Sequence, residues 1–350
     1  MKPAVRNSFI FAFALVLIVM LASCKKSEPV AVSSGTSGGA AAGKLQIVYI
    51  PKNTGNPYFD PMIEGFKKAC QENGADFTSI APADADATSQ LPIIKDQIQR
   101  GVNVIALSPN SPDALNPALR QAMSQGIAVI TVDSDLTGNE NSRTAGVLTV
   151  DPETVGQSLV ELQGSLMNYS GQFAILSATT DAPNQNAWID IMKKTLADNP
   201  KYKNMQLVET VYGNDEPQKS LTEAEALLTK YPDLKGITAP TTVGIAAAAQ
   251  CVQTAGKAQQ VKVTGLGTPN QMRRYLKDGT VTAFALWSPF DEGYLAGQLA
   301  CQIANKSVTP AAGTSFTAGT LGKRDFKALN VVITGAPVTF TKDNIDQFNF

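Results

Sequence analysis

Histidine is absent from the whole 350-residue sequence. Because histidine is the usual general base and a common metal ligand, its absence excludes His-based catalytic triads and His-ligated metal sites. Phosphate-binding loops are lacking as well. GLGTPN (265–270) has no third glycine and follows a late strand, and no Lys-Ser or Lys-Thr pair completes a Walker motif. Only carboxylates at predicted strand ends remain for acid–base chemistry, so we expect no enzyme activity and no cofactor.

Cysteine is scarce, with four residues in the chain. Beyond Cys24, the three others are Cys70, Cys251 and Cys301, and all three fall within predicted helices. An odd number cannot pair completely within one chain, and no spacing suits a metal site. We therefore expect buried thiols and no bound metal.

An excess of basic charge is also missing. Without residues 1–23 the chain has 27 basic and 30 acidic residues, and no basic patch interrupts this balance. A nucleic-acid partner is therefore not expected. Hydrophobic residues make up 43% of the chain, which is enough to build two cores of ordinary domain size.

Long apolar runs are confined to the start of the chain. FIFAFALVLIVMLAS (9–23) follows Lys2 and Arg6 and is shorter than the ~20 residues of a membrane-spanning helix. LASC (21–24) resembles the lipobox of bacterial lipoproteins, which implies a signal peptide over 1–23 and lipidation of Cys24. The alternative is an ordinary transmembrane anchor. With a lipid anchor, the protein would lie in the cell envelope, in the periplasm or on the outer face of a bacterial membrane.

After this start, the composition changes twice. Residues 24–43 are rich in Ser, Gly and Ala and have little to bury, which predicts a flexible tether. From Lys44 onward, short apolar runs alternate with amphipathic helical patterns. Continuous apolar strands separated by single helices indicate parallel sheets buried on both faces. Because this pattern restarts after a helix at about 152–167, we predict two successive doubly wound α/β units.

Polar and aromatic side chains gather where the predicted strands end. In doubly wound sheets, ligands bind at the carboxyl ends of the strands. A sugar needs donors and acceptors for its hydroxyl groups and aromatic surfaces for its C–H faces. The aromatic residues could equally cover the apolar core. Asp133 and Asp135 could equally cap the turn that follows each of them. The candidate ligand-binding residues are Lys52, Asn53, Asn56, Phe59, Ser108, Asp133, Asp135, Asn184, Gln185, Trp188, Pro240, Thr242, Gly267 and Trp287.

At these residues the chain resembles the type I periplasmic sugar-binding lipoproteins of ABC transporters. Within that group it is most similar to the rhamnose-binding and autoinducer-2-binding branch. The stretches that carry the resemblance are IPKNTGNPYFD (50–60), VDSD (132–135), TDAPNQNAW (180–188), the segment 264–289 and FTKDNIDQFNF (340–350).

The resemblance implies two doubly wound parallel-sheet domains joined by a three-segment hinge. The first domain would cover 44–150 and be completed by about 287–330. The second would cover 151–286 and be completed by about 331–350. We expect hinge segments near 133–150, near 266–281 and from Trp287 toward the C-terminal region. The implied function is a monomeric receptor that delivers a sugar to the permease of an ABC importer.

The sequence differs from the autoinducer-2 binders at two positions that affect which ligand is expected. In autoinducer-2 binders the resemblance places contacts at Lys52, Asp133, Asn184, Gln185, Pro240 and Thr242. Those binders have an aspartate at the position of Asn184 and an alanine at that of Thr242. An asparagine donates as well as accepts, whereas an ionised aspartate only accepts. NQNAW (184–188) and PTTVGIAAAA (240–249) look like rhamnose binders. We therefore expect rhamnose or a similar deoxy sugar, with autoinducer-2 as the alternative.

Two further classes of function share this two-domain body. Sugar-responsive repressors carry an N-terminal helix-turn-helix, where this chain has a lipoprotein-like signal and a tether. A ligand receptor for a chemotaxis or sensor system would use the same cleft, and the sequence leaves that alternative open.

Overall fold

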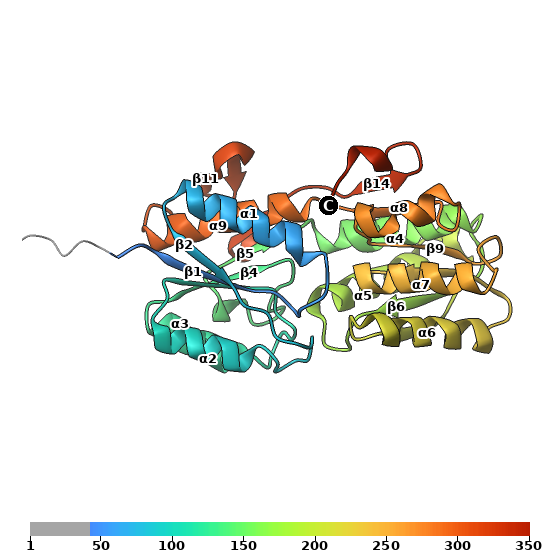
Figure 1. Cartoon of the computed structure of the whole chain (residues 1–350), viewed down its shortest axis with the longest axis horizontal. Helices are drawn as coiled ribbons and strands as arrows, with labels where there is room; N and C mark the ends of the chain where they lie inside the picture. The colour runs from blue at the N-terminus through green and yellow to red at the C-terminus, as the bar shows by residue number, and fades with distance from the viewer. Residues whose placement is uncertain (1–42) are drawn as a thin grey trace, which may run out of the picture. The chain divides into compact units, whose positions relative to one another are not determined.

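The structure is a computed structural model that describes residues 43–350 (Figure 1). The predicted signal peptide, the predicted lipidation site Cys24 and nearly all of the predicted tether lie outside the described residues. Within residues 43–350, no helix combines the length and the apolar character needed to cross a membrane.

The first domain is built on a six-stranded parallel sheet with the order β13-β5-β4-β3-β1-β2. Ile47 of β1 pairs with Phe77 of β2 on one side and with Val104 of β3 on the other, so β1 lies inside the sheet. All four residues of β3 are buried, as expected for a strand covered on both faces. The strands are β1 (Gln46–Ile50), β2 (Asp76–Ser79), β3 (Val104–Leu107), β4 (Ala128–Val132), β5 (Ala145–Leu148) and β13 (Val331–Ile333).

Helices cover both faces of this sheet. Figure 1 shows α1 and α9 on one side of it and α2 and α3 on the other. Each face has its own apolar core, one containing Phe66 of α1 and Leu299 of α9, the other Ile94 of α2 and Leu119 of α3. The helices are α1 (Phe59–Glu72), α2 (Leu91–Arg100), α3 (Asn116–Ser124) and α9 (Pro289–Ala304). A small antiparallel pair, β11 (Ser315–Thr317) and β12 (Lys323–Asp325), follows α9.

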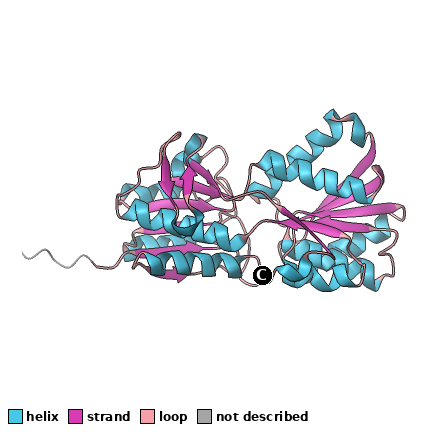
Figure 2. Cartoon of the chain, turned by 90° about the horizontal axis from the view of Figure 1, so that it is seen from above, coloured by secondary structure: helices cyan, strands magenta, loops and turns pink. Residues whose placement is uncertain are grey.

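The second domain has a four-stranded parallel sheet with the order β7-β6-β8-β9. A parallel bridge between Leu266 and Ala285 links its β9 side to β10, which pairs antiparallel with β14. Figure 2 shows the strands in two groups, each flanked by helices. The strands are β6 (Ser170–Ser177), β7 (Asn204–Tyr212), β8 (Leu234–Ala239), β9 (Lys262–Gly265), β10 (Ala283–Leu286) and β14 (Val338–Thr341). The helices are α4 (Pro152–Leu166), α5 (Pro183–Asp198), α6 (Pro217–Lys230), α7 (Thr242–Thr254) and α8 (Pro269–Lys277).

The chain passes between the two domains three times, and the predicted fold class of two parallel-sheet α/β domains is confirmed. The crossings lie between β5 and α4, between β10 and α9, and between β13 and β14. Two details of the prediction were wrong. Residues 266–281 form no crossing, because they lie between β9 and β10, which the Leu266–Ala285 bridge joins within the second domain. Strand 331–333 pairs with β5 of the first sheet, so the last crossing follows Ile333.

The contact between α1 and α9 depends on glycine. A Cβ atom added to Gly65 of α1 would lie 2.1 Å from the Phe290 backbone oxygen, and one added to Gly293 of α9 would lie 2.0 Å from the Met62 backbone oxygen. Side chains at these positions would push the two helix backbones apart. The close approach brings the first turn of α9 against the start of α1, next to the carboxyl end of β1.

Gly65→Ala is expected to destabilise the protein by about 1–3 kcal/mol or more, because overpacking against backbone atoms cannot be relieved by a rotamer change. Gly335→Ala is the control, since a Cβ there meets no atom within 4 Å. Urea unfolding of both variants measures the difference. Equal midpoints for the two variants would contradict the close helix contact.

Candidate functional site

The candidate site is a cavity between the carboxyl ends of the two parallel sheets. It contains about 350 Å³ of space not filled by atoms, part of it open to solvent. In both sheets the strand order reverses beside the cavity, between β1 and β3 and between β6 and β8. This is where doubly wound sheets place their ligands. The lining residues are Lys52, Asn56, Tyr58, Phe59, Asp133, Asn184, Gln185, Trp188, Asp215, Pro240, Thr241, Thr242, Leu266, Leu286 and Trp287.

Asp133 occupies the first position after β4 in a left-handed backbone conformation, with φ 66°. Few residues other than glycine adopt this conformation, and asparagine and aspartate tolerate it best. The Asp133 amide donates to the Val147 oxygen of β5, which fixes the turn. The turn leaves the Asp133 side chain at the cavity wall. A non-glycine residue held in this region is a frequent feature of ligand sites.

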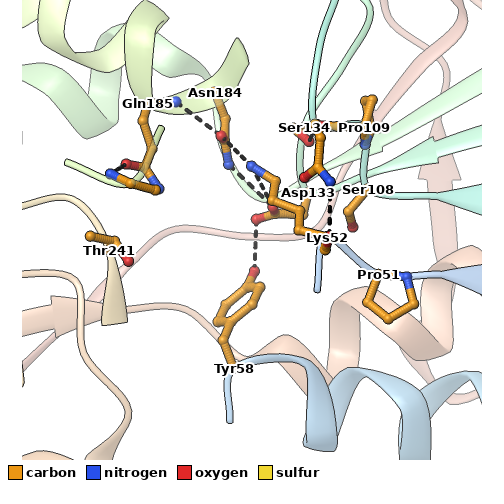
Figure 3. Close-up of polar contacts among 12 residues, drawn as sticks. Pro51, Lys52, Tyr58, Ser108, Pro109, Asp133, Ser134, Asn184, Gln185 and Thr241 are labelled. Atoms are coloured by element: carbon orange, nitrogen blue, oxygen red, sulfur yellow. Dashed lines mark hydrogen bonds and ion pairs between the residues drawn. The ribbon is translucent and has the colours of Figure 1, made fainter. Parts of the chain in front are cut away.

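Three side chains hold the Asp133 carboxylate (Figure 3). The Tyr58 hydroxyl lies 3.0 Å from Oδ1, the Asn184 amide donates to Oδ2 at 3.1 Å, and the Lys52 ammonium lies 3.9 Å from Oδ2. Burial raises the pKa of Asp133, and the Lys52 charge opposes that rise. The cation beside it therefore favours the ionised, hydrogen-bond-accepting form of this buried group.

Lys52 connects the two domains. It follows β1 of the first domain, and its ammonium donates to Oδ1 of Asn184 in α5 of the second domain at 2.8 Å. Burial lowers the pKa of Lys52, and the Asp133 and Asp215 charges raise it. A buried lysine at this strand end balances the charge of two nearby carboxylates, which an ordinary surface lysine would not do.

A second group of polar side chains lies on the opposite side of the cavity. Asp215, which follows β7, accepts from the Thr241 hydroxyl and lies 3.5 Å from the Asn56 amide nitrogen. The Thr242 hydroxyl donates to the Asn56 side-chain oxygen at 2.9 Å, again between domains. Burial raises the pKa of Asp215, and the hydrogen bond from Thr241 lowers it.

Aromatic side chains form the remaining wall. The rings of Trp188 in α5 and Trp287 after β10 are 5.8 Å apart and inclined at 64°. Tyr58 and Phe59 lie edge-to-face at 5.2 Å. Each of the four is buried and also lines the cavity, so they can both cover the apolar core and contact a ligand.

Gln185 is held by its side-chain oxygen, which accepts hydrogen bonds from Ser177 and Ala178. Its amide nitrogen has no partner among residues 43–350.

Four predicted residues do not line the cavity. Ser108 is hydrogen bonded to the Tyr49 hydroxyl at 2.8 Å. Asn53 is buried beside the site, and Gly267 is packed against Met272 and Ile245. The Asp135 carboxylate is bound by the Arg143 guanidinium through both of its oxygens at 2.5 Å. These contacts favour a structural role for Asp135. That role is an ion pair with Arg143 and not only the capping of a turn.

The list of candidate residues omitted four polar residues of this region, Tyr58, Asp215, Thr241 and Glu292. Asp215 directly follows the loop after a predicted strand, so the strand-end rule would have found it. Tyr58 and Thr241 also lie just after predicted strands, whereas Glu292 carries no such signal, because its role depends on the contact between α1 and α9.

The chain belongs to the family described as periplasmic binding protein domain, whose profile matches residues 47–307. This match covers the whole alternating part of both domains. The family is one of binding proteins, and the relatives with which the chain is compared below are binding proteins rather than enzymes. The location of the chain is extracytoplasmic.

Three similar proteins illustrate the relationship. An ABC transporter solute-binding protein from Clostridium phytofermentas with bound L-rhamnose is 37% identical, with a TM-score of 0.83 over 87% of this chain and 98% of the other. LsrB from Clostridium saccharobutylicum in complex with AI-2 is 27% identical, with a TM-score of 0.81 over 87% of this chain and 100% of the other. The D-ribose/D-allose-binding protein of Pseudomonas aeruginosa is 29% identical over 77% of this chain and 84% of its own length.

The Asp135–Arg143 ion pair allows a test of whether Asp135 stabilises the fold or binds the ligand. The Arg143 side chain is 1% exposed, so Asp135→Ala leaves an uncompensated buried guanidinium. We expect a loss of about 3–5 kcal/mol in unfolding free energy. Sugar affinity, measured under conditions where the variant is folded, should stay close to that of the wild type.

Asp84→Ala removes an exposed carboxylate and is the matched control. Calorimetric titration and urea unfolding of both variants are needed. A normal unfolding midpoint with lost sugar affinity in Asp135→Ala would restore Asp135 as a ligand residue.

Proposed function

We propose that the protein is the solute-binding lipoprotein of an ABC importer and that it binds rhamnose or a similar deoxy sugar between its two domains. The observation that carries this proposal is the convergence of Lys52, Asp133 and Asn184, from both domains, beside two tryptophan rings on one small cavity. The rhamnose-bound relative supports the same ligand.

The chemistry of the cavity suits a neutral polyol. Asp133 and Asp215 accept hydrogen bonds, and Lys52 and the amide nitrogens of Asn184 and Gln185 donate them. A sugar hydroxyl can both donate and accept, so each can be matched with a side chain of this set. The indole rings of Trp188 and Trp287 offer apolar surface to C–H groups, and the methyl group of a deoxy sugar adds to that contact.

Asn184 favours rhamnose over autoinducer-2. Its amide nitrogen donates to Asp133 while its oxygen accepts from Lys52. An aspartate at this position could not donate, and it would set a second carboxylate against Asp133. Thr242 likewise uses its hydroxyl to bond with Asn56, which an alanine could not do. The two departures from the autoinducer-2 pattern thus have definite partners in this chain.

Autoinducer-2 is the second candidate ligand, supported by the likeness to the AI-2 complex of LsrB. Ribose and allose, which appear in the name of the Pseudomonas aeruginosa relative, would use the same polar side chains but lack the methyl group that contacts the tryptophan rings. A sensor or chemotaxis receptor with the same cleft is an alternative use of the bound ligand. A permease and ATPase encoded nearby would favour import, and a nearby kinase would favour sensing.

We also propose the envelope arrangement that the N-terminal sequence implies. Residues 1–23 act as a signal peptide, lipidated Cys24 anchors the chain, and residues 24–43 link the anchor to a monomeric receptor. The first domain comprises 44–150 and the segment from about 287 to the last crossing, and the second comprises 151–286 and the final residues. Because each domain supplies part of the site, ligand binding would favour the closed arrangement of the domains.

Asp133→Ala tests the proposed site. Hydrogen bonds to a charged group contribute ~1.5–3 kcal/mol each, so rhamnose affinity should fall by roughly tenfold to more than a hundredfold. Calorimetric titration measures it, and the melting temperature shows whether the fold is retained. Asp181→Ala, which removes an exposed carboxylate near the start of α5, should leave affinity unchanged. Normal rhamnose affinity in folded Asp133→Ala would refute the site.

The double variant Asn184→Asp with Thr242→Ala tests the ligand. It recreates the autoinducer-2 pattern, and we expect weaker rhamnose binding with at most weak autoinducer-2 binding. Titration of wild type and variant with both compounds provides the comparison. If the wild type binds autoinducer-2 more tightly than rhamnose, the proposed ligand is wrong while the receptor function stands.

A further inference from the structure

The Tyr58 hydroxyl contacts three polar groups that come from different parts of the chain. The Trp287 indole nitrogen donates to it at 2.8 Å. Its oxygen lies 3.0 Å from Oδ1 of Asp133 and 2.9 Å from Oε2 of Glu292. Tyr58 thus links the cavity carboxylate to a second carboxyl group behind the cavity wall, in the first turn of α9.

The hydrogen atoms available to this cluster decide its chemistry. A phenol has one hydrogen to donate and two lone pairs with which to accept. Trp287 uses one lone pair, so one hydrogen and one lone pair remain for two carboxyl groups. Each carboxyl group can have a hydrogen bond of its own with the phenol, not a shared one, only if one accepts the phenolic hydrogen and the other donates a hydrogen. An ionised carboxylate has none to donate, so this arrangement requires one of the two to be protonated.

The surroundings indicate which group holds that proton. Asp133 has the Lys52 ammonium at 3.9 Å and the Asn184 amide at 3.1 Å, and both favour its ionised form. Glu292 is 0% exposed, and its Oε1 has no partner among residues 43–350. No cation contacts it there. The protonated group is therefore Glu292.

The groups around Glu292 shift its pKa in both directions, and burial has the largest effect. Asp133, Tyr58 and Tyr49 face it from β4 and from the β1–α1 region, with Lys52 and Asp215 beyond Asp133. Burial raises the pKa of Glu292 well above its ordinary value and the Asp133 charge raises it further, whereas hydrogen bonds involving Tyr58, the Asp133 backbone and Trp287 lower it. The N-terminal turn of α9 also favours a charged carboxylate, but a helix end has a smaller effect than full burial.

We propose that Glu292 is a positioning residue for sugar binding, held as a neutral carboxylic acid that donates to the Tyr58 oxygen. Tyr58 then has its only hydrogen committed to Oδ1 of Asp133. This fixes the rotation of the Asp133 carboxylate and directs its remaining acceptor capacity toward Asn184 and the cavity. The effect on sugar binding rests on the proposed function, whereas the protonation of Glu292 does not.

The first test needs no ligand. Glu292→Gln keeps the shape and a donor but cannot ionise. In the unfolded wild type, Glu292 ionises above its ordinary pKa of about 4.3 while the folded form stays protonated. The raised pKa therefore stabilises the fold fully at acid pH, and this contribution is lost as pH rises. The unfolding constant of the wild type relative to Glu292→Gln should grow by up to about tenfold per pH unit above that value.

Urea unfolding of both proteins over a series of pH values measures this ratio. Asp291→Asn changes the neighbouring, partly exposed carboxylate in the same helical turn and should show no comparable trend. A ratio for Glu292→Gln that is independent of pH would show that Glu292 ionises normally in the folded protein, and it would overturn the proposal.

The second test concerns the sugar. Glu292→Gln should bind rhamnose about as well as the wild type, whereas Glu292→Leu, which cannot donate to Tyr58, should bind about tenfold more weakly or worse while still folded. Weak binding by folded Glu292→Gln, or normal binding by Glu292→Leu, would overturn the positioning role. If the wild type itself does not bind rhamnose, the proposed ligand fails, and the pH series still decides the protonation of Glu292.

Discussion

The burial of one carboxylate, Asp133, sets the requirements that much of the site satisfies. An ionised carboxylate removed from water is costly unless charge and hydrogen bonds replace its hydration. Lys52 supplies the opposite charge, and Asn184 and Tyr58 occupy its oxygens. Two of these partners come from the first domain and one from the second. The electrostatic need of a single residue thus ties the carboxyl ends of β1 and β4 to the start of α5.

Much of the architecture could be predicted from the sequence because local patterns determine it. Strands β1 and β8 are two of the short, mostly apolar runs that indicate parallel sheets, and each ends directly before a proline, Pro51 and Pro240. The residues that directly follow strands or begin helices, such as Lys52, Asp133 and Asn184, were also found, because the parallel topology brings strand ends together. The resemblance to a known family added the pairing of these residues across two domains.

What could not be predicted depends on contacts between distant segments. Asp135 has the same local setting as Asp133, and only the approach of Arg143 from the start of β5 separates an ion-paired residue from a ligand candidate. Glu292 looks like an ordinary first-turn acid of a helix, and its burial follows from the glycine contact between α1 and α9. The last crossing was misplaced by a few residues, because VVI at 331–333 suits either sheet and only its pairing with β5 decides.

The two tryptophans have an optical consequence. The chain contains only Trp188 and Trp287, and both line the cavity with their rings 5.8 Å apart. The indole emission of the entire protein therefore originates at the ligand-facing wall, from one ring on the second domain and one at a crossing between domains. Trp287 is also hydrogen bonded to Tyr58, so its excited state is in direct contact with the polar cluster behind Asp133. The molecule thus carries an intrinsic, label-free reporter whose spectrum reflects the polarity of this one cavity.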